Sequence, residues 1–480
     1  MAHVPDVVGR CCLALSLLFN STVSYPGNST YTASLGSYFT LQQAGIHPRC
    51  IVTPRSVDEV STVVRVLTNN ANSITPTCSF AVRAGGHSTS VGASNIQGGV
   101  TIDLRDLHDI TLNQDKNIVS IGSGVTWGAV YSYLDPLNLT VVGGRTSSVG
   151  VAGVTIGGGI SYFGPRYGWA CDTVSNFEVV LANGSIVNAN EHENPRLLWA
   201  LRGGAGNFGI VTRIDMRTLQ QGNLWGGTLI HNMSMKDAEI DAIANFSRAD
   251  HYDEHSSLIS TFVYSEGQFF IVNGLEYTEN VVDPPVFRPF LQMPYLSSTL
   301  KSTNMTTLAA ESEILQMKQQ RVTYATITIR PTAKAITAIV GAWNSSVKSI
   351  QDIEGIIWSI DFDPLPATFY ARNANGNALG LGSRQNRPLA VVLLSVTWSN
   401  ARDDARVEVA MRALIRTMQK RTSSLDALDP YLYLNYAAAW QNPLASYGQA
   451  SMANLRQIRR DYDPRKIFTV NKPGGFKLLG

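Results

Sequence analysis

Apolar and polar positions in the first half of the chain form short strand-like runs interleaved with helical patterns. Residues 100–104 and 118–121 alternate with the two-residue period of a strand. Residues 56–67 have the pattern of a capped amphipathic helix that follows a strand, and residues 125–134 that of a second helix. This interleaving predicts a domain of the α+β class that ends near residue 219.

Between residues 220 and 429 the pattern shifts to longer strands flanked by helices. Residues 226–230 and 324–329 predict strands, whereas residues 237–246 and 401–420 predict helices. Strands and helices in this arrangement favour an antiparallel sheet covered by helices, which would roof a ligand held by the first domain. No internal repeat or coiled coil is evident.

Three glycine-rich segments interrupt the first domain, at residues 83–88, 143–159 and 201–212. The first, Arg-Ala-Gly-Gly-His-Ser, leaves an apolar strand and places an imidazole in a glycine turn. Adjacent glycines let the backbone approach a phosphate or a flat ring, and successive turn amides bind anions. The second segment is too glycine-dense for an ordinary helix. Together the three segments predict one large ligand wrapped by backbone.

The third segment satisfies the dinucleotide fingerprint G-x-G-x-x-G at Gly204, Gly206 and Gly209. That fingerprint requires a strand before it and a helix after it. Here residues 194–201 predict a turn and a helix before the glycines, and residues 210–216 predict a strand after them. A nicotinamide-binding Rossmann unit is therefore disfavoured.

The motif at residues 83–88, the two later glycine segments and the C-terminal tyrosines resemble a known family. It is the berberine bridge enzyme-like branch, in its fungal form, of the FAD-linked oxidoreductases with a PCMH-type FAD-binding domain (vanillyl-alcohol oxidase superfamily). The likeness covers Cys50 to about Thr218 and resumes at Pro430. It implies a two-part FAD-binding domain at 46–219, an antiparallel-sheet substrate-binding domain covered by helices at 220–429, and a segment at 430–480 that returns to the FAD domain.

The resemblance implies that His87 bonds covalently to the 8-methyl carbon of the FAD isoalloxazine. Many relatives have a second, cysteine tether where this chain has Thr146, so a singly attached flavin is expected. Relatives with a valine at position 149 tend to leave room for dioxygen, which favours an oxidase; the alternative is that Val149 is simply a packed residue. The other implied cofactor contacts are Arg83, Ala84, Gly85, Gly86, Ser88, Thr146, Val149, Gly150, Gly153, Gly157, Gly158, Gly209, Ile210, Val211 and Asn435.

The segment Tyr431–Tyr436 alternates strictly, which predicts a strand with Tyr431, Tyr433 and Asn435 on one face and Tyr436 on the other. The resemblance implies that Tyr436 is the base that removes a substrate proton. Because a tyrosine titrates near about 10, such a base needs a nearby cation or strong donors. The sequence does not name that group. Without the resemblance, each tyrosine is equally well explained as a packed aromatic.

We therefore predict an FAD-dependent oxidoreductase that removes hydride from a small organic molecule and passes the electrons to dioxygen, forming hydrogen peroxide. The resemblance implies a fungal secondary metabolite as substrate. A carbohydrate oxidase on the same fold is the alternative, which Thr146 disfavours because sugar-oxidising relatives generally carry the second tether. A flavin-containing non-redox cyclase or binding scaffold is the alternative from another class.

Composition agrees with a globular enzyme. The 480 residues exceed one compact core, the net charge is +2, and 44% of the residues are hydrophobic. Neither charge nor composition indicates a polyanionic partner, and the arginines of the predicted helix before Asp463 fit a solvated face better than a nucleic-acid site. No Cys/His spacing resembles a metal site. We expect a monomer.

The N-terminus predicts secretion. Arg10 is followed by the apolar run Cys11–Phe19, which is too short to span a bilayer of about 30 Å but suits the core of a signal peptide at residues 1–24. A secreted or secretory-pathway glycoprotein is therefore expected. Sequons at Asn20, Asn28, Asn138, Asn183, Asn232, Asn245, Asn304 and Asn344 agree with this.

Cleavage of this leader would remove Cys11 and Cys12. Cys50, Cys78 and Cys171 would then remain, an odd number that leaves at least one free thiol. We expect a Cys50–Cys78 disulfide, consistent with a secreted protein, and a buried, inert Cys171. Family members often bridge an earlier cysteine to the position of Cys78, but no cysteine that survives cleavage precedes Cys50.

Overall fold

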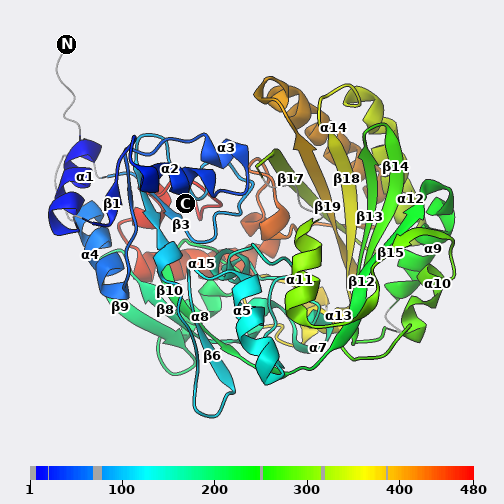
Figure 1. Cartoon of the computed structure of the whole chain (residues 1–480), viewed down its shortest axis with the longest axis horizontal. Coiled ribbons are helices and arrows are strands. Elements are labelled where there is room, and N and C mark those ends of the chain that lie inside the picture. The colour runs from blue at the N-terminus through cyan, green and yellow to red at the C-terminus, as the bar shows by residue number, and fades with distance from the viewer. Residues whose placement is uncertain are drawn as a thin grey trace.

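The computed structural model describes residues 7–19, 21–68, 78–248, 252–314, 319–384 and 387–479. Figure 1 shows two halves side by side. The N-terminal half, in blue and cyan, contains two larger sheets and a two-stranded one, and the second half, in green to orange, is built on one large sheet. The red C-terminal segment lies within the first half.

The first sheet is small and mixed, and its strand β3 leads into the His87 turn. The strand order is β1-β2-β4-β3, in which β2, β4 and β3 are parallel and β1 is antiparallel to β2. The bounds are β1 (Val23–Ser24), β2 (Cys50–Val52), β3 (Phe80–Arg83) and β4 (Val100–Asp103). Helix α4 (Val57–Thr68) buries Val60, Val63 and Leu67 beside this sheet, which confirms the amphipathic helix predicted at 56–67.

A five-stranded antiparallel sheet follows along the chain, in the order β5-β6-β10-β8-β9. Its bounds are β5 (Ile110–Leu112), β6 (Ile118–Gly122), β8 (Val174–Val180), β9 (Ile186–Asn190) and β10 (Ile210–Arg217). Helix α5 (Trp127–Leu134) confirms the helix predicted at 125–134. Helix α8 (Pro195–Leu201) comes before the glycine turn and β10 after it, so the order that excludes a Rossmann fingerprint is confirmed.

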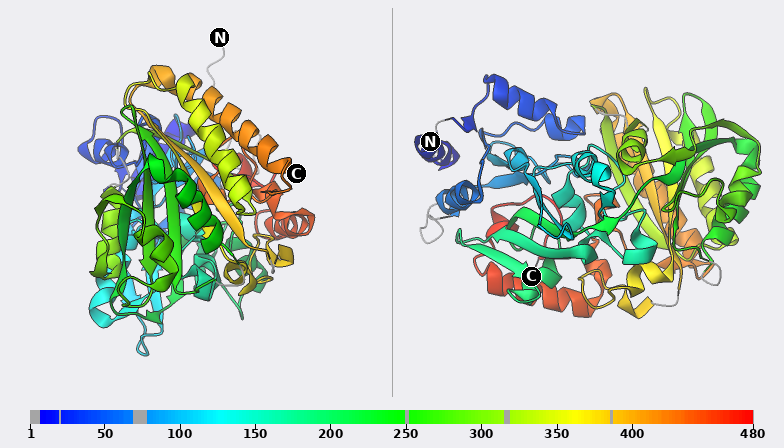
Figure 2. Two further views of the ribbon diagram at one scale, coloured as in Figure 1. Left: turned by 90° about the vertical axis from the view of Figure 1, so that its right-hand side faces the viewer. Right: turned by 60° about the horizontal axis from the view of Figure 1, so that its bottom comes forward.

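The large sheet is antiparallel, with the order β15-β12-β14-β13-β18-β19-β17-β20, and β16 also pairs with β12. Its bounds are β12 (Leu224–Asn232), β13 (Ser256–Ser265), β14 (Gln268–Tyr277), β15 (Tyr295–Ser298), β16 (Lys301–Thr303), β17 (Arg321–Ile329), β18 (Ile357–Leu365), β19 (Leu389–Trp398) and β20 (Leu428–Asp429). Helices α9 (Lys236–Phe246), α12 (Ala333–Ser346) and α14 (Asp404–Ser423) cover one face (Figure 2). The predicted antiparallel sheet with a helical cover is confirmed.

Strand alternation gives this sheet two unlike faces. On β18, Trp358, Ile360 and Phe362 pack under the helices, so Asp361 and Asp363 project from the other face. By the same alternation that other face, here called the polar face, carries Thr261, Glu276, Tyr324, Asp361, Asp363 and Ser395. At its margin Leu365, Leu389 and Val391 join the core of the first half, so the polar face is turned toward the glycine-rich loops.

The second glycine-rich segment contains a helix, which corrects the prediction for 143–159. Helix α6 (Val151–Ile156) buries Val151, Ala152 and Thr155. This packing outweighs the weak helix propensity of its internal Gly153. The remaining elements are α2 (Ser29–Gly36), α3 (Leu41–Ala44), α7 (Gly164–Tyr167), α10 (Arg288–Leu291), α11 (Met305–Ile314), α13 (Ala367–Ala371), and the paired β7 (Leu139–Thr140) and β11 (Leu219–Gln220).

The C-terminal segment packs on the first half of the molecule. Helix α15 (Gln449–Tyr462) contacts α8 and ends directly before Asp463, as its Asp-Pro stop predicts. Helix α16 (Ile467–Val470) adds its first two residues to the core beside the first sheet. Beyond it, the carbonyl of Asn471 accepts a 2.8 Å hydrogen bond from the backbone N–H of Phe80, at the start of β3.

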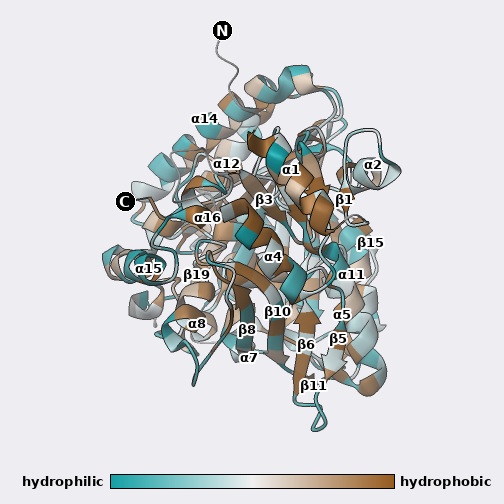
Figure 3. Ribbon diagram, turned by 90° about the vertical axis from the view of Figure 1, so that its left-hand side faces the viewer, coloured by the Kyte–Doolittle hydropathy of each residue, from teal (hydrophilic) through white to brown (hydrophobic). Residues whose placement is uncertain are grey.

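The N-terminus contradicts the predicted cysteine pairing. Residues Val7–Leu18 form helix α1, which lies beside α4 (Figure 3). The structure pairs Cys11 with Cys78 and Cys12 with Cys50, so the expected Cys50–Cys78 disulfide is wrong. The prediction failed because it removed α1 with the leader. Here α1 belongs to the core beside the first sheet, where both its cysteines are buried.

The structure also shows the environment of Cys171 and of the glycosylation sequons. Cys171 is buried and free, as predicted. Of the sequons, Asn20 lies outside the described residues and Asn304 is half-buried. The exposed ones are Asn28, Asn138, Asn183, Asn232, Asn245 and Asn344. Within the described parts of the chain, no helix combines the length and apolar character needed to cross a membrane.

Candidate functional site

Gly85 and Gly150 bring the first two glycine-rich segments into backbone contact. A Cβ added to Gly85 would lie 2.6 Å from the Cα of Gly150. The next residue, Gly86, has a φ of +74°, and a Cβ there would lie 2.8 Å from the Nε of Arg83. Side chains at these positions would push the two segments apart or strain the turn, so glycine is a steric requirement here.

His87 follows Gly86 directly. Its side chain is half-buried, and its ring is stacked on the ring of Phe39. The ring centroids lie 3.8 Å apart with an interplanar angle of 11°. The flanking Ala84 and Ser88 are half-buried, and the Oγ of Ser88 accepts a 3.3 Å hydrogen bond from the backbone N–H of Ser90. The stacking therefore fixes the plane of the imidazole before any ligand is bound.

The side chain of Arg83 is buried against the inner side of this turn, beside Gly86, and its role as a cofactor contact stays a prediction. Its guanidinium is buried, donates hydrogen bonds to Ser34 and Ser37, and lies 3.6 Å from Asp103. It also stands 3.8 Å from the ring centroid of Tyr38. These contacts hold α2 against β3, so Arg83 supports the turn from behind.

Asn435 brings the C-terminal segment onto α6. Its Nδ2 donates a 3.0 Å hydrogen bond to the carbonyl of Val154, and a Cβ on Gly157 would lie 2.1 Å from its Oδ1. Gly158 follows with a φ of +108°. Gly153 differs from these glycines because it is exposed, with no atom within 4 Å of an added Cβ.

Only the backbone of the third glycine-rich segment is available to a ligand, because its side chains are packed in the protein. A Cβ on Gly209 would lie 2.4 Å from Cγ1 of Val179. Ile210 and Val211 are buried at the start of β10, and the carbonyl of Val211 accepts a 2.6 Å hydrogen bond from Ser123. Any cofactor contact of these three residues is consequently limited to main-chain groups.

Thr146 and Val149 lie in the loop before α6. Thr146 is buried with its Oγ1 3.4 Å from the Oγ of Ser312 on α11. Val149 is half-buried and packs against the core of the first half. Part of the Val149 side chain is therefore packed against this core, as the alternative interpretation expected. The rest of the side chain is accessible.

The predicted alternating strand at Tyr431–Tyr436 is wrong. Strand β20 ends at Asp429, and Leu434–Tyr436 form a turn of 3₁₀ helix. The turn brings the rings of Tyr433 and Tyr436 edge to face, with centroids 4.9 Å apart. Side-chain packing has overridden the period-two pattern, because this segment crosses between the two halves and does not extend a sheet.

Tyr436 meets a cation that was not predicted. The Nη2 of Arg145 donates a 2.5 Å hydrogen bond to the phenolic oxygen of Tyr436. The same guanidinium pairs with Asp363 through distances of 3.0 Å and 3.2 Å. Planar pairing of this kind fixes the position of an arginine. Arg145 therefore joins the second glycine-rich segment, the polar face and the C-terminal segment.

Burial and charge act on Tyr436 in opposite directions. Desolvation raises the pKa of its hydroxyl well above the ordinary value, Arg145 lowers it and Asp363 raises it again. Desolvation also acts on Arg145, but Asp363 and Tyr436 keep the pKa of its guanidinium raised. Tyr436 is accordingly a neutral phenol at neutral pH, with one permanent cation placed to stabilise negative charge on its oxygen.

Two further carboxyls near Arg145 escaped the sequence analysis. Burial raises the pKa of Glu276 to about 8, with Arg145 opposing and Asp363 adding to the shift. Burial likewise raises the pKa of Asp361 to about 7, although Thr261 lowers it by a hydrogen bond. The available signal was the Asp-x-Asp alternation inside the apolar strand 357–365. Glu276 has no comparable signal.

These residues fit an FAD. The Gly85–Gly150 contact and the open Gly153 leave main chain free to face a flat ring, and the fixed imidazole of His87 lies beside it. The positive-φ glycines 86 and 158 supply turns suited to a diphosphate. The polar face and Tyr436 close the opposite side, where an oxidisable substrate would lie.

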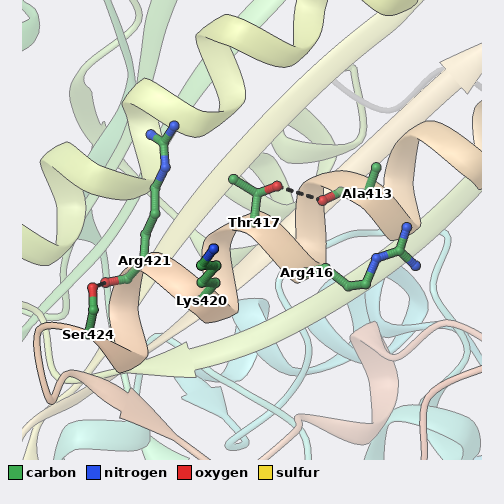
Figure 4. Close-up of a pocket in the computed structure, with 6 residues that line it drawn as sticks. All are labelled: Ala413, Arg416, Thr417, Lys420, Arg421 and Ser424. Carbon is green, nitrogen blue, oxygen red and sulfur yellow. Dashed lines mark hydrogen bonds between the residues drawn. The ribbon is translucent and has the colours of Figure 1, made fainter.

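A separate surface hollow lies on α14 and is lined by Arg416, Thr417, Lys420 and Arg421 (Figure 4). The inner residues of α14 pack on the helix-covered face of the large sheet. Because the candidate site is on the polar face, the sheet itself separates the two. The hollow is therefore not part of the site.

The comparisons with known proteins agree with this site. The family described as "FAD binding domain" matches residues 48–190. The chain is 33% identical over 98% of its length to "FAD-dependent monooxygenase CTB5" of Cercospora beticola, and covers 91% of that protein. It is 39% identical over 95% of its length to "Oligopeptidase PhomG'" of Diaporthe leptostromiformis, but spans only 36% of that protein.

The fold also matches a solved structure, glucooligosaccharide oxidase of Acremonium strictum, with a TM-score of 0.75 and 20% identity, covering 98% of both chains. That structure is described as containing a 6-S-cysteinyl, 8α-N1-histidyl FAD. Fold and site together define an FAD-binding oxidoreductase. The chain belongs to the family of FAD-linked oxidoreductases that includes these fungal relatives, and the PCMH-type FAD-binding domain implied by its motifs is confirmed.

Proposed function

We propose that this protein is an oxidase that holds FAD through one covalent bond to His87 and uses Tyr436 as the base toward a small organic substrate. The hydrogen bond from Arg145 to Tyr436 is the observation that supports this most directly. It supplies the cation that base chemistry by a tyrosine requires. FAD, when bound, accepts the hydride that leaves the substrate carbon.

Different residues would anchor the cofactor, accept the proton and stabilise the negative charge. His87, with its ring fixed on Phe39, anchors the cofactor, and the backbone of the three glycine-rich segments encloses it. Tyr436 would act as its phenolate, formed when the phenol proton passes to solvent, and the phenolic oxygen would then receive the substrate proton. Arg145 donates to that oxygen throughout, so negative charge on it is stabilised by a preorganised donor.

Single attachment is supported by Thr146, which faces Ser312 where a cysteine tether would stand. A threonine hydroxyl is a poor nucleophile compared with a thiolate. Val149, with part of its side chain accessible, supports dioxygen as the electron acceptor.

The substrate class follows from the relatives and from Thr146. Relatives at 33% identity are described as FAD-dependent monooxygenases of fungi, which supports a fungal secondary metabolite. The alternative carbohydrate oxidase shares the fold of glucooligosaccharide oxidase, but the chain lacks a counterpart of its cysteinyl bond. Passage through the secretory pathway is supported by six exposed sequons.

The visible spectrum before and after acid precipitation tests this function. The purified protein should be yellow, and the colour should stay in the pellet, with the flavin found by mass spectrometry on the His87 peptide alone. His87→Ala should release the flavin into the supernatant. A colourless protein, or a second flavin-bearing peptide that contains Thr146, would contradict the proposal.

A further inference from the structure

Asp361 differs from the other acids near Arg145 because it is accessible. Asp363 and Glu276 are 2% and 4% exposed, whereas Asp361 is half-buried on the same polar face. Arg145 is already engaged by Asp363 and Tyr436. Among the residues that the structure describes, Asp361 forms no ion pair.

The neighbours of Asp361 place it beside the proposed reaction centre. It pairs across the sheet with Thr261 on β13 and Leu393 on β19. Its charge acts on both Tyr324 and Tyr436, whose rings lie edge to face with centroids 6.3 Å apart. Thr261 and Tyr324 are half-buried as well, so this part of the polar face is accessible.

A half-buried carboxyl without an ion pair is costly unless hydrogen-bond donors satisfy it, and beside the one that Thr261 supplies the carboxylate can accept a further donor from a ligand. The charged groups that act on Asp361 are Asp363 on its own strand and Arg145 from the first half. Asp363 repels a second negative charge, and Arg145 cannot turn to Asp361 without leaving Asp363. A donor from the substrate would satisfy the carboxyl, whereas a carboxylate on the substrate would be repelled.

We propose that Asp361 is the substrate-selecting residue of this site, where its carboxyl accepts a hydrogen bond from a hydroxyl or ammonium group of the substrate and excludes substrates that place a carboxylate there. This inference rests on the proposed function, because it assumes that the substrate lies between Tyr436 and the cofactor. It adds the class of substrate: a molecule with a donor close to the carbon that is oxidised.

Binding of three aromatic probes to the holoenzyme tests this inference. Benzyl alcohol is a neutral donor, benzylamine a cationic donor, and benzoate an anion without a donor. Perturbation of the flavin spectrum and calorimetry, which needs no flavin, report their affinities. We expect both donors to bind at least about tenfold more tightly than benzoate, the value of one hydrogen bond to a charged group. Tighter binding of benzylamine than of benzyl alcohol would identify an ammonium substrate, and equal binding a hydroxyl.

Asp361→Asn should reduce this preference about tenfold. From pH 6 to pH 8 the preference should grow more in the unaltered enzyme, where Asp361 ionises, than in Asp361→Asn, where Glu276 on the same face still ionises. Asp352→Asn is the matched control, because Asp352 is exposed and pairs with Arg406 on the surface. Thr261→Val keeps the Asp361 carboxyl but removes the hydrogen bond that lowers its pKa. The pH at which the binding preference is half developed should therefore rise. An unchanged preference in Asp361→Asn, or equal binding of benzoate and the two donors, would overturn the inference. A colourless preparation that still shows the preference by calorimetry would overturn the proposed function instead.

Discussion

The guanidinium of Arg145 and the phenol of Tyr436 are joined by a 2.5 Å hydrogen bond although 291 positions separate them in the chain. Arg145 belongs to the loop that precedes α6, and Tyr436 to the segment that returns from the large sheet. Asp363 of β18 holds the same guanidinium from a third side. The reaction centre exists only where these three segments meet.

Tyr436→Phe should lower turnover by about 100-fold or more, because it removes the proposed base and leaves the ring in place. The flavin colour should be unchanged. Tyr431→Phe is the matched control, because the hydroxyl of Tyr431 is buried and has no hydrogen-bond partner among the residues that the structure describes. Steady-state oxygen consumption measures both variants. Normal turnover by Tyr436→Phe would remove this residue from the mechanism.

Arg145→Gln should make turnover depend more steeply on alkaline pH. Burial raises the pKa of Tyr436 and Arg145 lowers it, so loss of the guanidinium moves the pKa of the phenol further up. Ionisation of the phenol then requires a higher pH, and kcat/KM at neutral pH should fall by about tenfold or more. The measurement is a kcat/KM profile from pH 6 to pH 10. Identical profiles for variant and parent enzyme would contradict the role of Arg145.

Gly153→Ala and Gly157→Ala should separate cofactor binding from folding. An added Cβ at Gly153 meets nothing within 4 Å, so the variant should fold normally yet bind less FAD if the cofactor lies over it. A Cβ at Gly157 would lie 2.1 Å from Oδ1 of Asn435 and should lower the melting temperature as well. Flavin-to-protein absorbance ratios and thermal unfolding report the two effects. Full FAD content in Gly153→Ala would place the cofactor elsewhere.

Glu276 should make the folded protein less stable as pH rises. Burial raises the pKa of its carboxyl from 4.5 to about 8, so the folded protein keeps a proton that the unfolded chain releases between these values. Stability then falls with rising pH across this window, by at most about 1.4 kcal/mol per pH unit. Glu276→Gln stays neutral and should flatten this slope, as measured by urea unfolding at pH 5 and pH 8. The exposed Glu279→Gln should keep the parent slope.

Cys12→Ser should destabilise the protein by about 2–4 kcal/mol, because Cys12 and Cys50 close a separation of 38 residues and fasten α1 to the first sheet. Cys171→Ser is the control, since this thiol is free. Urea unfolding measures both variants, and mass spectrometry of the isolated protein shows whether α1 is retained. A chain that begins after Leu18 would show that α1 is removed and that neither disulfide persists.

The sequence could predict most elements of the fold because the hydrophobic period records which residues are buried. Helices such as α4 and α14 and strands such as β6 and β17 lie where their patterns place them. The segment Tyr431–Tyr436 failed the same test, since a period of two is also compatible with tyrosines that pack individually. The uncleaved chain packs the predicted leader as helix α1, because an apolar run followed by small polar residues fits either a signal peptide or a packed helix, and cleavage stays a prediction.

The sequence by itself indicated FAD as the cofactor and, through its resemblance to a known family, predicted His87 as the anchor. Glycines at Gly85, Gly86 and Gly150 and the imidazole of His87 form local motifs whose chemistry depends on neighbouring positions. The tertiary structure alone decided what surrounds the reacting atoms: Arg145 against Tyr436, Asp363 behind both, and Asp361 and Glu276 on one face of a sheet. The pKa values and charge balance of such groups depend on desolvation and on distances between residues that are remote in the chain, and no local pattern records them.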